Sequence, residues 1–224
     1  MRTIPKGALV VSCQARADNP LHGPVFMAAM AAAARDGGAG AIRADGPDDI
    51  AAIRSAVDLP IVGILKRFRD DVPVYITPDF AAAETVVAAG ADIVALDATP
   101  RARGGEDLAG LVAAIRGRLA RPVFADVSTL TEGLAADALG VDYVATTLAG
   151  YTDETRVSRE AGPNLALVAA LAARCRAPVV AEGRFDTPEL AAAALAAGAH
   201  AVVVGTMITN PREITRRFAA ALAC

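Results

Sequence analysis

Short apolar runs alternate with longer segments rich in Ala and Leu along the chain. The runs are nearly continuous, as in strands that are covered on both faces of a parallel sheet. Eight such runs begin at or just after Ala8, Gly38, Pro60, Gly90, Pro122, Gly140, Pro178 and Gly198. The intervening segments carry apolar residues at helical spacing. They predict helices over 24–36, 47–57, 79–89, 105–118, 131–139, 164–175, 187–197 and 211–222.

Proline and glycine mark the boundaries of these segments. Proline stands at the predicted helix starts Gly46-Pro47, Thr77-Pro78-Asp79, Thr187-Pro188-Glu189 and Asn210-Pro211. Proline has no amide hydrogen to lose in the first turn, and glycine tolerates the left-handed exit from a helix. Eight strand–helix units predict a parallel sheet with right-handed crossovers, which at this length closes into a (β/α)8 TIM barrel. We expect one barrel domain over residues 1–224.

An open, doubly wound sheet is the structural alternative. Such a sheet is expected to have fewer strands and a glycine-rich phosphate loop after the first one. Neither GxGxxG nor GxxxxGK[ST] occurs in the sequence. The barrel is therefore the favoured fold.

Composition and charge narrow the classes of partner. The chain has 224 residues, 54% of them hydrophobic, which suits a large buried core, and its formal net charge is −3. A nucleic-acid or membrane-surface binder needs a basic excess, so neither partner is expected. The uncharged stretch Leu190–Thr209 is Ala-rich and repeats the strand–helix pattern, which favours a barrel segment over a membrane span.

The cysteines give an expectation about location. Cys13, Cys175 and Cys224 form no disulfide framework and match no metal-binding spacing. Unpaired cysteines are typical of a reducing compartment, so we expect a cytoplasmic protein. We interpret Cys13 as a packing residue, because no histidine is predicted at a strand end to activate it.

Polar residues end each predicted strand. In (β/α)8 barrels the carboxyl ends of the strands carry the chemistry. The residues at these ends are Gln14, Arg43, Lys66-Arg67, Asp97, Asp126, Thr146-Thr147, Glu182-Gly183-Arg184 and Gly205-Thr206. Charged side chains are seldom buried without a partner, so their convergence predicts a ligand site. The alternative is a structural ring of ion pairs, Arg43 with Asp126 or Lys66 with Glu182.

The last two strand ends predict a phosphate site. Gly183-Arg184 and Gly205-Thr206 are small-residue turns with free backbone amides, each leading toward a helix start. Amides at a helix N-terminus attract anions, and Arg184 would add charge-assisted hydrogen bonds. The other interpretation is that the glycines only permit tight turns.

With a phosphate there, the rest of a sugar phosphate would reach Lys66. We expect Glu182, Asp126, Arg43 and Gln14 to surround it. Burial and the neighbouring cations Arg43 and Arg67 predict a lowered pKa for Lys66. A neutral amine in that position can act as a general base.

Several phrases in the same order resemble a known family. They are VVSCQ (10–14), AIR (41–43), PIVGILKR (60–67), PVYITP (73–78), GADIVALD (90–97), DVST (126–129), TTLAGYT (146–152), AEGR (181–184) and VGTMIT (204–209). Together they resemble the N-acetylmannosamine-6-phosphate 2-epimerases, also called N-acylglucosamine-6-phosphate 2-epimerases. The resemblance covers residues 7–218.

The resemblance implies a cofactor-independent isomerase of amino-sugar metabolism and sialic acid degradation. Its members convert N-acetylmannosamine 6-phosphate to N-acetylglucosamine 6-phosphate by inverting C2, use no metal and are often homodimers. The lysine matching Lys66 would remove the C2 proton, and Glu182 would assist ring opening or the developing enolate. Gln14, Arg43 and Asp126 would hold the sugar. One departure is Asn210, where members usually carry Arg.

The same site residues also suit other functions. A strand-end lysine beside a glutamate is also typical of a Schiff-base (class I) aldolase, and a non-catalytic phosphosugar-binding barrel would share the pocket. A metal-dependent pentose-phosphate epimerase needs histidine ligands, whereas His22 and His200 are not placed at strand ends. For the epimerase itself, one base for both faces of C2 and a second acid opposite Lys66 are both open.

Overall fold

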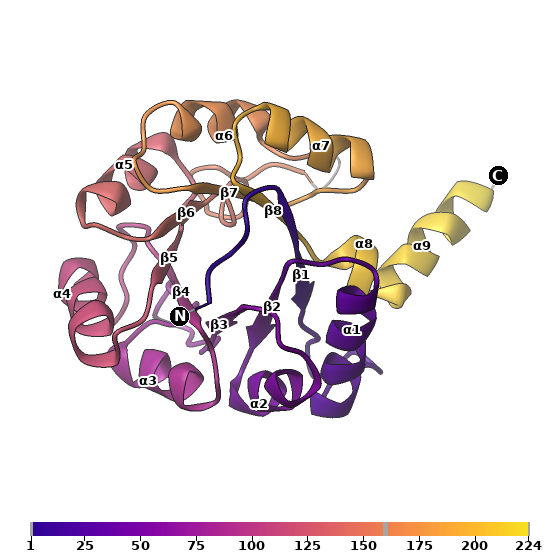
Figure 1. Cartoon of the computed structure of the whole chain (residues 1–224). Helices are drawn as coiled ribbons and strands as arrows, with labels where there is room; N and C mark the ends of the chain where they lie inside the picture. The colour runs from indigo at the N-terminus through magenta and orange to yellow at the C-terminus, as the bar shows by residue number, and fades with distance from the viewer. Residues whose placement is uncertain (1, 159–160, 224) are drawn as a thin grey trace.

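Eight parallel strands close into a barrel in the computed structural model, which describes residues 2–158 and 161–223. Each strand pairs with the next, and β8 pairs with β1, so the predicted (β/α)8 barrel is confirmed (Figure 1). The strands are β1 (Ala8–Cys13), β2 (Ala41–Asp45), β3 (Ile61–Ile64), β4 (Ile93–Asp97), β5 (Val123–Asp126), β6 (Tyr143–Ala145), β7 (Val179–Glu182) and β8 (Ala201–Val204). Every predicted strand is present.

The helices follow the predicted segments within a few residues. They are α1 (Pro24–Asp36), α2 (Pro47–Ala56), α3 (Phe80–Ala88), α4 (Leu108–Ala114), α5 (Leu130–Ala138), α6 (Leu165–Ala172), α7 (Pro188–Ala196), α8 (Thr206–Thr209) and α9 (Pro211–Leu222). A π-helical turn, Ile115–Leu119, continues α4. The short helix α8 lies within the VGTMIT phrase and was not predicted.

Side-chain caps explain several helix starts. The Asp79 side chain accepts a hydrogen bond from the amide of Ala82, and the Thr187 hydroxyl accepts one from Leu190. At α5, Thr129 and Glu132 form a reciprocal capping box. These contacts satisfy amide hydrogens that the first turn leaves unpaired, so local sequence fixes where these helices begin.

The core has two layers. Side chains on one face of the strands fill the barrel interior, and those on the other face pack against the surrounding helices. The interior includes Val10, Val62, Ile93, Phe124 and Val180. Because the side-chain period of a strand is two, each strand contributes alternate residues to each layer.

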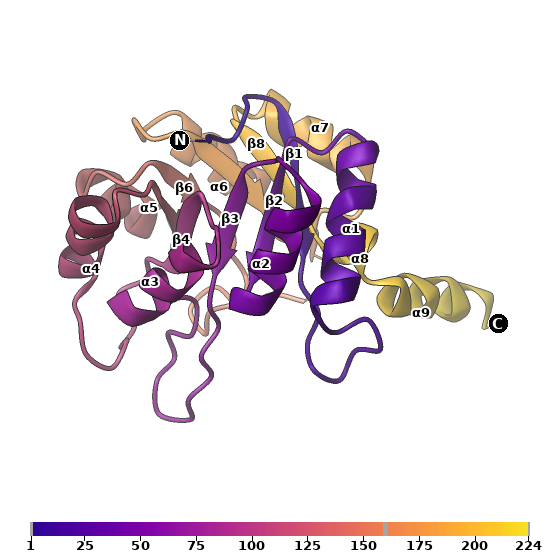
Figure 2. The ribbon, with the colours of Figure 1, turned by 60° about the horizontal axis from the view of Figure 1, so that its bottom comes forward.

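The N-terminal segment closes the amino end of the barrel (Figure 2). Ile4 is buried with the interior cluster; its amide donates to the Tyr143 hydroxyl at 3.2 Å. Its carbonyl lies 2.9 Å from Nε2 of His200. The long loops after β1 and β3 lie at the other end of the barrel, the carboxyl end of the strands.

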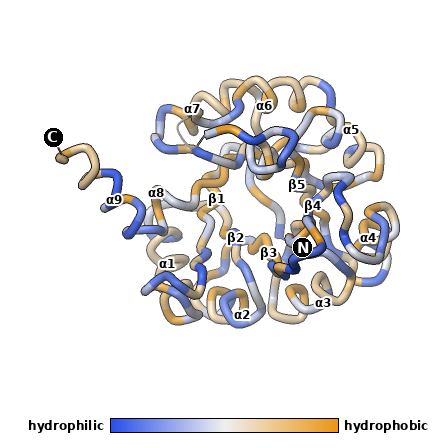
Figure 3. Tube along the Cα trace, turned by 180° about the vertical axis from the view of Figure 1, so that it is seen from behind, coloured by the Kyte–Doolittle hydropathy of each residue, from blue (hydrophilic) through white to orange (hydrophobic). Residues whose placement is uncertain are grey.

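Helix α9 departs from the usual barrel arrangement. It leaves the barrel instead of covering it, and none of its residues is buried (Figures 1 and 3). It packs against α8, and Arg217 pairs with Asp186 at 2.8 Å. The prediction of a helix over 211–222 is confirmed, but its apolar face has no cover within the chain's described part.

The uncharged stretch Leu190–Thr209 contributes to α7 and β8, as the repeat predicted, and to the unpredicted helix α8. Among the helices of residues 2–158 and 161–223, none has the length and apolar character needed to cross a bilayer.

Candidate active site

The centre of the barrel mouth is a buried ion-pair cluster. Arg43, only 1% exposed, donates from Nη1 and Nη2 to the two carboxylate oxygens of Asp126, at 2.9 and 2.6 Å. Its Nη1 also donates to Oε2 of Glu182 at 2.8 Å. The guanidinium lies 5.2 Å from the centroid of the Phe124 ring. One arginine from β2 thus binds carboxyl groups from β5 and β7.

Thr147 joins the same cluster from the loop after β6. Its hydroxyl lies 2.5 Å from Oδ1 of Asp126 and 3.1 Å from Oε2 of Glu182. The neighbouring Thr146 hydroxyl bonds the backbone carbonyl and amide of Glu182, at 2.9 and 3.0 Å. Thr146 therefore holds the backbone of Glu182, and Thr147 contacts its carboxyl.

The electrostatics of the cluster follow from burial and charge. Burial alone disfavours the cationic form of Arg43, but Asp126 and Glu182 outweigh it and raise the pKa of the guanidinium. Burial, together with the negative charge of Asp126, raises the pKa of Glu182 despite the nearby Arg43. Glu182 therefore retains its proton to a higher pH than an ordinary glutamate.

Lys66 lies just beyond β3 and points into the same mouth. Its Nζ donates to Oε1 of Gln14 at 2.5 Å and is 3.6 Å from Oδ2 of Asp45. Gln14 is held in turn by its Nε2, which donates to the Ser12 hydroxyl at 2.8 Å. The amine is thus aimed by acceptors from β2 and from the loop after β1.

Burial lowers the pKa of Lys66, as the sequence predicted. Asp45 and Glu182 oppose this shift, whereas Arg43 and Arg16 add to it. The predicted contribution of Arg67 is replaced by that of Arg16, because the Arg67 guanidinium binds the Asp79 carboxylate at 2.9 and 3.0 Å. Arg16 reaches the mouth from the first loop, where its guanidinium lies 5.7 Å from the Phe68 ring.

The two turns predicted to bind phosphate differ in whether a helix follows directly. Gly205 is the N-cap of the short helix α8, so this turn does open onto a helix. The other turn does not: α7 begins at Pro188, with Thr187 as its cap. Gly183 adopts a φ of +107°, which favours glycine. Contacts of Gly183, Gly205 and Thr206 with a phosphate stay predictions.

Arg184 is engaged within the protein. Its Nε donates to the Gly162 carbonyl at 2.7 Å, and its Nη1 donates to the Ala149 carbonyl at 2.8 Å. The guanidinium also lies 5.1 Å from the centroid of Tyr151. In this structure Arg184 ties the loop after β6 to the end of β7, and its contact with a phosphate stays a prediction.

Sequence reasoning missed Asp45 as a site residue and mentioned Thr147 only as a strand end. A simple signal finds both, because residues two apart on a strand face the same side. Asp45 is two residues beyond Arg43, and Thr147 continues the inward positions Tyr143 and Ala145. The inward register therefore changes from apolar to polar at the mouth.

Asp97, which ends another predicted strand, binds residues of the loop that follows it. Its carboxylate accepts hydrogen bonds from the amide and hydroxyl of Thr99 and pairs with Arg101 at 2.6 Å. Burial nevertheless raises its pKa. Asp97 is thus held by its own loop, through a local ion pair that is separate from the Arg43 cluster.

The side chains of His22, His200 and Cys13 have structural roles. Nδ1 of His22 lies 2.9 Å from the Ala15 carbonyl, and His200 is at the amino end of the barrel. Cys13 is buried, and burial with the nearby Asp49 raises the pKa of its thiol to about 12, which disfavours a nucleophilic role. No metal-binding group of three or more His, Cys, Asp or Glu side chains occurs in residues 2–158 and 161–223.

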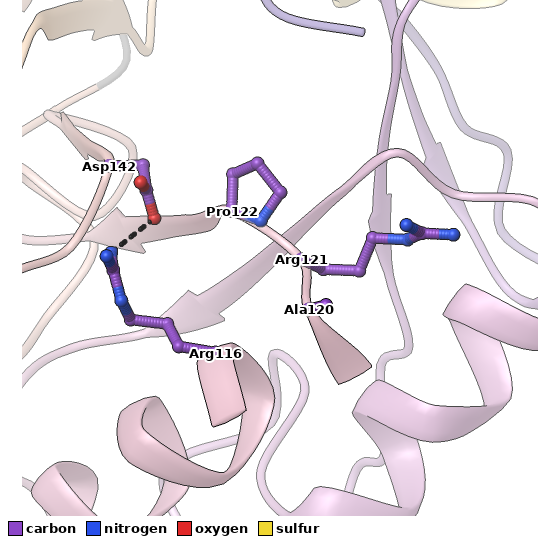
Figure 4. Close-up of a pocket in the computed structure, with 5 residues that line it drawn as sticks. All are labelled: Arg116, Ala120, Arg121, Pro122 and Asp142. Atoms are coloured by element: carbon purple, nitrogen blue, oxygen red, sulfur yellow. Dashed lines mark hydrogen bonds and ion pairs between the residues drawn. The ribbon is translucent and has the colours of Figure 1, made fainter. Parts of the chain in front are cut away.

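A surface pocket lies away from this cluster (Figure 4). It is lined by Arg116, Ala120, Arg121, Pro122 and Asp142, and Arg116 pairs with Asp142 at 2.8 Å. Pro122 and Asp142 immediately precede β5 and β6. The pocket is therefore at the amino end of these strands, opposite the mouth.

Fold and site together define a (β/α)8-barrel enzyme with a lysine and an arginine–carboxyl cluster at the carboxyl ends of its strands. The family described as "Putative N-acetylmannosamine-6-phosphate epimerase" matches residues 27–223. The chain belongs to this N-acetylmannosamine-6-phosphate 2-epimerase family.

Relatives and solved structures agree with this assignment. The chain is 46% identical to a "Putative N-acetylmannosamine-6-phosphate 2-epimerase" of Shouchella clausii, over 97% of this chain and 96% of the relative. It is 47% identical to a relative of the same name from Enterobacter sp., over 97% and 93%. A structure of the N-acetylmannosamine-6-phosphate 2-epimerase from Clostridium perfringens superposes with a TM-score of 0.93 and 44% identity, covering 98% and 95%.

A more distant structure shares the fold alone. The thiamine phosphate pyrophosphorylase from Pyrococcus furiosus has a TM-score of 0.60 at 18% identity, covering 97% of each chain.

Proposed function

We propose that the protein inverts C2 of an N-acylated hexosamine 6-phosphate, interconverting N-acetylmannosamine 6-phosphate and N-acetylglucosamine 6-phosphate. The observation that carries the proposal is the amine of Lys66, whose pKa burial lowers, in the same mouth as the Arg43–Asp126–Glu182 cluster. Membership of the epimerase family supports the same reaction.

The chemistry needs a base and an acid in one place. In the open-chain sugar, C2 is next to the C1 aldehyde, so its C–H bond is acidic. The neutral amine of Lys66 takes this proton, and the electron pair moves onto the aldehyde oxygen as an enolate. Return of a proton to the other face of C2 regenerates the aldehyde with C2 inverted. The proton count is unchanged.

Charged neighbours stabilise this intermediate. Arg43 supplies fixed positive charge near the oxygen on which negative charge develops. Burial raises the pKa of Glu182 and so favours its protonated form, in which it would assist ring opening or the enolate. Gln14, Arg43 and Asp126 are the proposed sugar-binding residues.

The phosphate of the substrate is proposed to lie at the ends of β7 and β8. Gly205 is the N-cap of α8 and Thr206 its first residue, and backbone amides at a helix start suit an anion. A short extra helix in this position is the usual phosphate site of (β/α)8 barrels. Gly183 and Arg184 would complete the site.

Heavy-water NMR with N-acetylmannosamine 6-phosphate tests the function. We expect purified protein to produce N-acetylglucosamine 6-phosphate with deuterium at C2, because the abstracted proton exchanges with solvent. Both sugars would carry the label at equilibrium. Binding without exchange would reject the epimerase and favour a phosphosugar-binding barrel, and a borohydride-trapped Lys66 adduct would favour the aldolase.

We also propose that the chain is a single cytoplasmic barrel domain that forms a homodimer. The free thiols of Cys13 and Cys175 are consistent with a reducing compartment. The uncovered helix α9 supports the dimer: Phe218 is 69% exposed and Leu222 is 80% exposed on one face of it. A second copy of the chain would cover this face with a symmetric, self-complementary interface.

Substitution of Phe218 by Glu tests the dimer. We expect wild-type protein to have the mass of two chains in size exclusion with light scattering, and Phe218→Glu to have the mass of one. A carboxylate on the apolar face opposes its burial in an interface. Ala220→Glu adds the same charge on the opposite face of α9 and should remain dimeric. A monomeric wild type would refute the proposal.

A further inference from the structure

We propose that Asp45 is a positioning residue for Lys66, holding the lysine backbone with one carboxylate oxygen and directing its amine with the other. The inference rests on the proposed role of Lys66 as the base. It adds a residue at the end of β2 that touches the base and not the reacting carbon.

The two contacts come from one carboxylate. Oδ1 of Asp45 accepts a hydrogen bond from the backbone amide of Lys66 at 3.0 Å, and Oδ2 lies 3.6 Å from Nζ. The Asp45 side chain is one-quarter exposed, so the pair is partly screened from water. A single side chain thus fixes both ends of the lysine, its main chain and its amine.

The backbone of Lys66 needs this support because β3 ends at Ile64. In the sheet register Asp45 is the partner of Ile64, the last strand residue before the lysine. Beyond that point, Leu65 donates its amide to the Thr77 hydroxyl at 3.2 Å, and Lys66 forms an isolated bridge with Ile76. The Asp45 carboxylate accepts the Lys66 amide where the β2–β3 ladder stops.

Asp45 also sets the charge around the amine. The charged groups that act most strongly on Lys66 within the described residues are Asp45 and Arg43 from β2, Glu182 from β7 and Arg16 from the first loop. Burial has the largest effect on the pKa of Lys66 and lowers it. Asp45 has the largest effect that raises this pKa. Without this carboxylate the pKa of Lys66 would fall further, leaving a weaker base that is neutral over a wider pH range.

The pH profile of kcat/KM for Asp45→Asn is the decisive measurement. The asparagine keeps an oxygen that accepts the Lys66 amide but removes the charge. The rate rises with pH as Lys66 loses its proton, so we expect this acid limb to move to lower pH and the plateau to fall. An unchanged limb would overturn the proposal. Asp48→Asn, an exposed carboxylate three residues away, removes the same charge and should leave the limb in place.

Asp45→Ala separates the two contacts. It removes both acceptors, so the limb should move in the same direction and kcat should fall by about 10²-fold, as misplaced catalytic groups typically do. Thermal unfolding of each variant checks that the fold is retained. An alanine variant with wild-type kcat would contradict the positioning role.

Lysine NMR makes the test independent of turnover. The sequence has two lysines, Lys6 and Lys66, so ε-¹³C-lysine labelling gives two signals, and Lys66→Ala identifies one of them. We expect the Lys66 signal of Asp45→Asn to titrate at lower pH than in wild type, with Lys6 unchanged. If the titration shifts but wild type exchanges no C2 hydrogen, the proposed reaction fails and the Asp45 contact stands. An unshifted titration in an active enzyme rejects the Asp45 proposal alone.

Discussion

Replacing Lys66 with alanine is expected to lower kcat about 10²- to 10⁴-fold, the usual contribution of a general base. The methyl group cannot accept the C2 proton, so deuterium exchange at C2 should fall together with epimerisation. Both rates are measured in one heavy-water NMR time course. The matched control is Lys6→Ala, which removes an exposed lysine at the amino end of the barrel and should leave kcat unchanged.

Lys66→Arg distinguishes a base from a fixed positive charge. Arginine remains protonated throughout the working pH range, so it preserves the charge but cannot accept a proton. We expect this variant to be as inactive as Lys66→Ala. Near-wild-type exchange in Lys66→Arg would show that the amine acts as a cation and that another group removes the proton.

The second large effect is expected from Arg43→Met, which should destabilise the fold by about 3–5 kcal/mol. The substitution leaves the carboxyl groups of Asp126 and Glu182 in a buried site without their arginine. Urea unfolding measures the loss. Arg116→Met is the control, because its pair with Asp142 is partly exposed and such pairs contribute about 0–1 kcal/mol.

The loss in Arg43→Met should depend on pH. Arg43 lowers the pKa of Glu182, which burial raises, so its removal raises the folded-state pKa further. A carboxyl with a raised folded-state pKa destabilises the fold once pH exceeds its unfolded-state value. The stability deficit should therefore be smaller in acid and grow as pH rises. Adding Asp126→Leu removes one stranded charge and should recover part of the stability; no recovery would mean that lost packing, not charge, causes the deficit.

The sequence predicts most of the fold because strand and helix have different periods. Continuous apolar runs bounded by Gly or Pro give all eight strands, and the helical segments agree with the structure to within a few residues. Polar strand ends locate the mouth and include Arg43, Asp126 and Glu182, which the structure brings into contact. Closure of the barrel follows from eight repeated strand–helix units in which each strand pairs with the next.

Other features depend on contacts that the sequence does not encode locally. Arg67 is adjacent to Lys66 in sequence but binds Asp79, whereas Arg16, fifty residues away, affects the amine. Helix α9 has an apolar face at helical spacing, but periodicity does not say what covers that face. Asp45 was predictable in principle, since it shares the inward side of β2 with Arg43.

The segment around Ile4 bears on which end of the barrel the substrate enters and the product leaves. In the part of the chain that the structure describes, Phe124 and its neighbours fill the interior, and Ile4 packs with them from the amino end. We therefore expect reactant and product to enter and leave through the mouth at the carboxyl ends of the strands, where they compete for the same site. A bulky ligand lodged at that rim would block turnover in both directions equally.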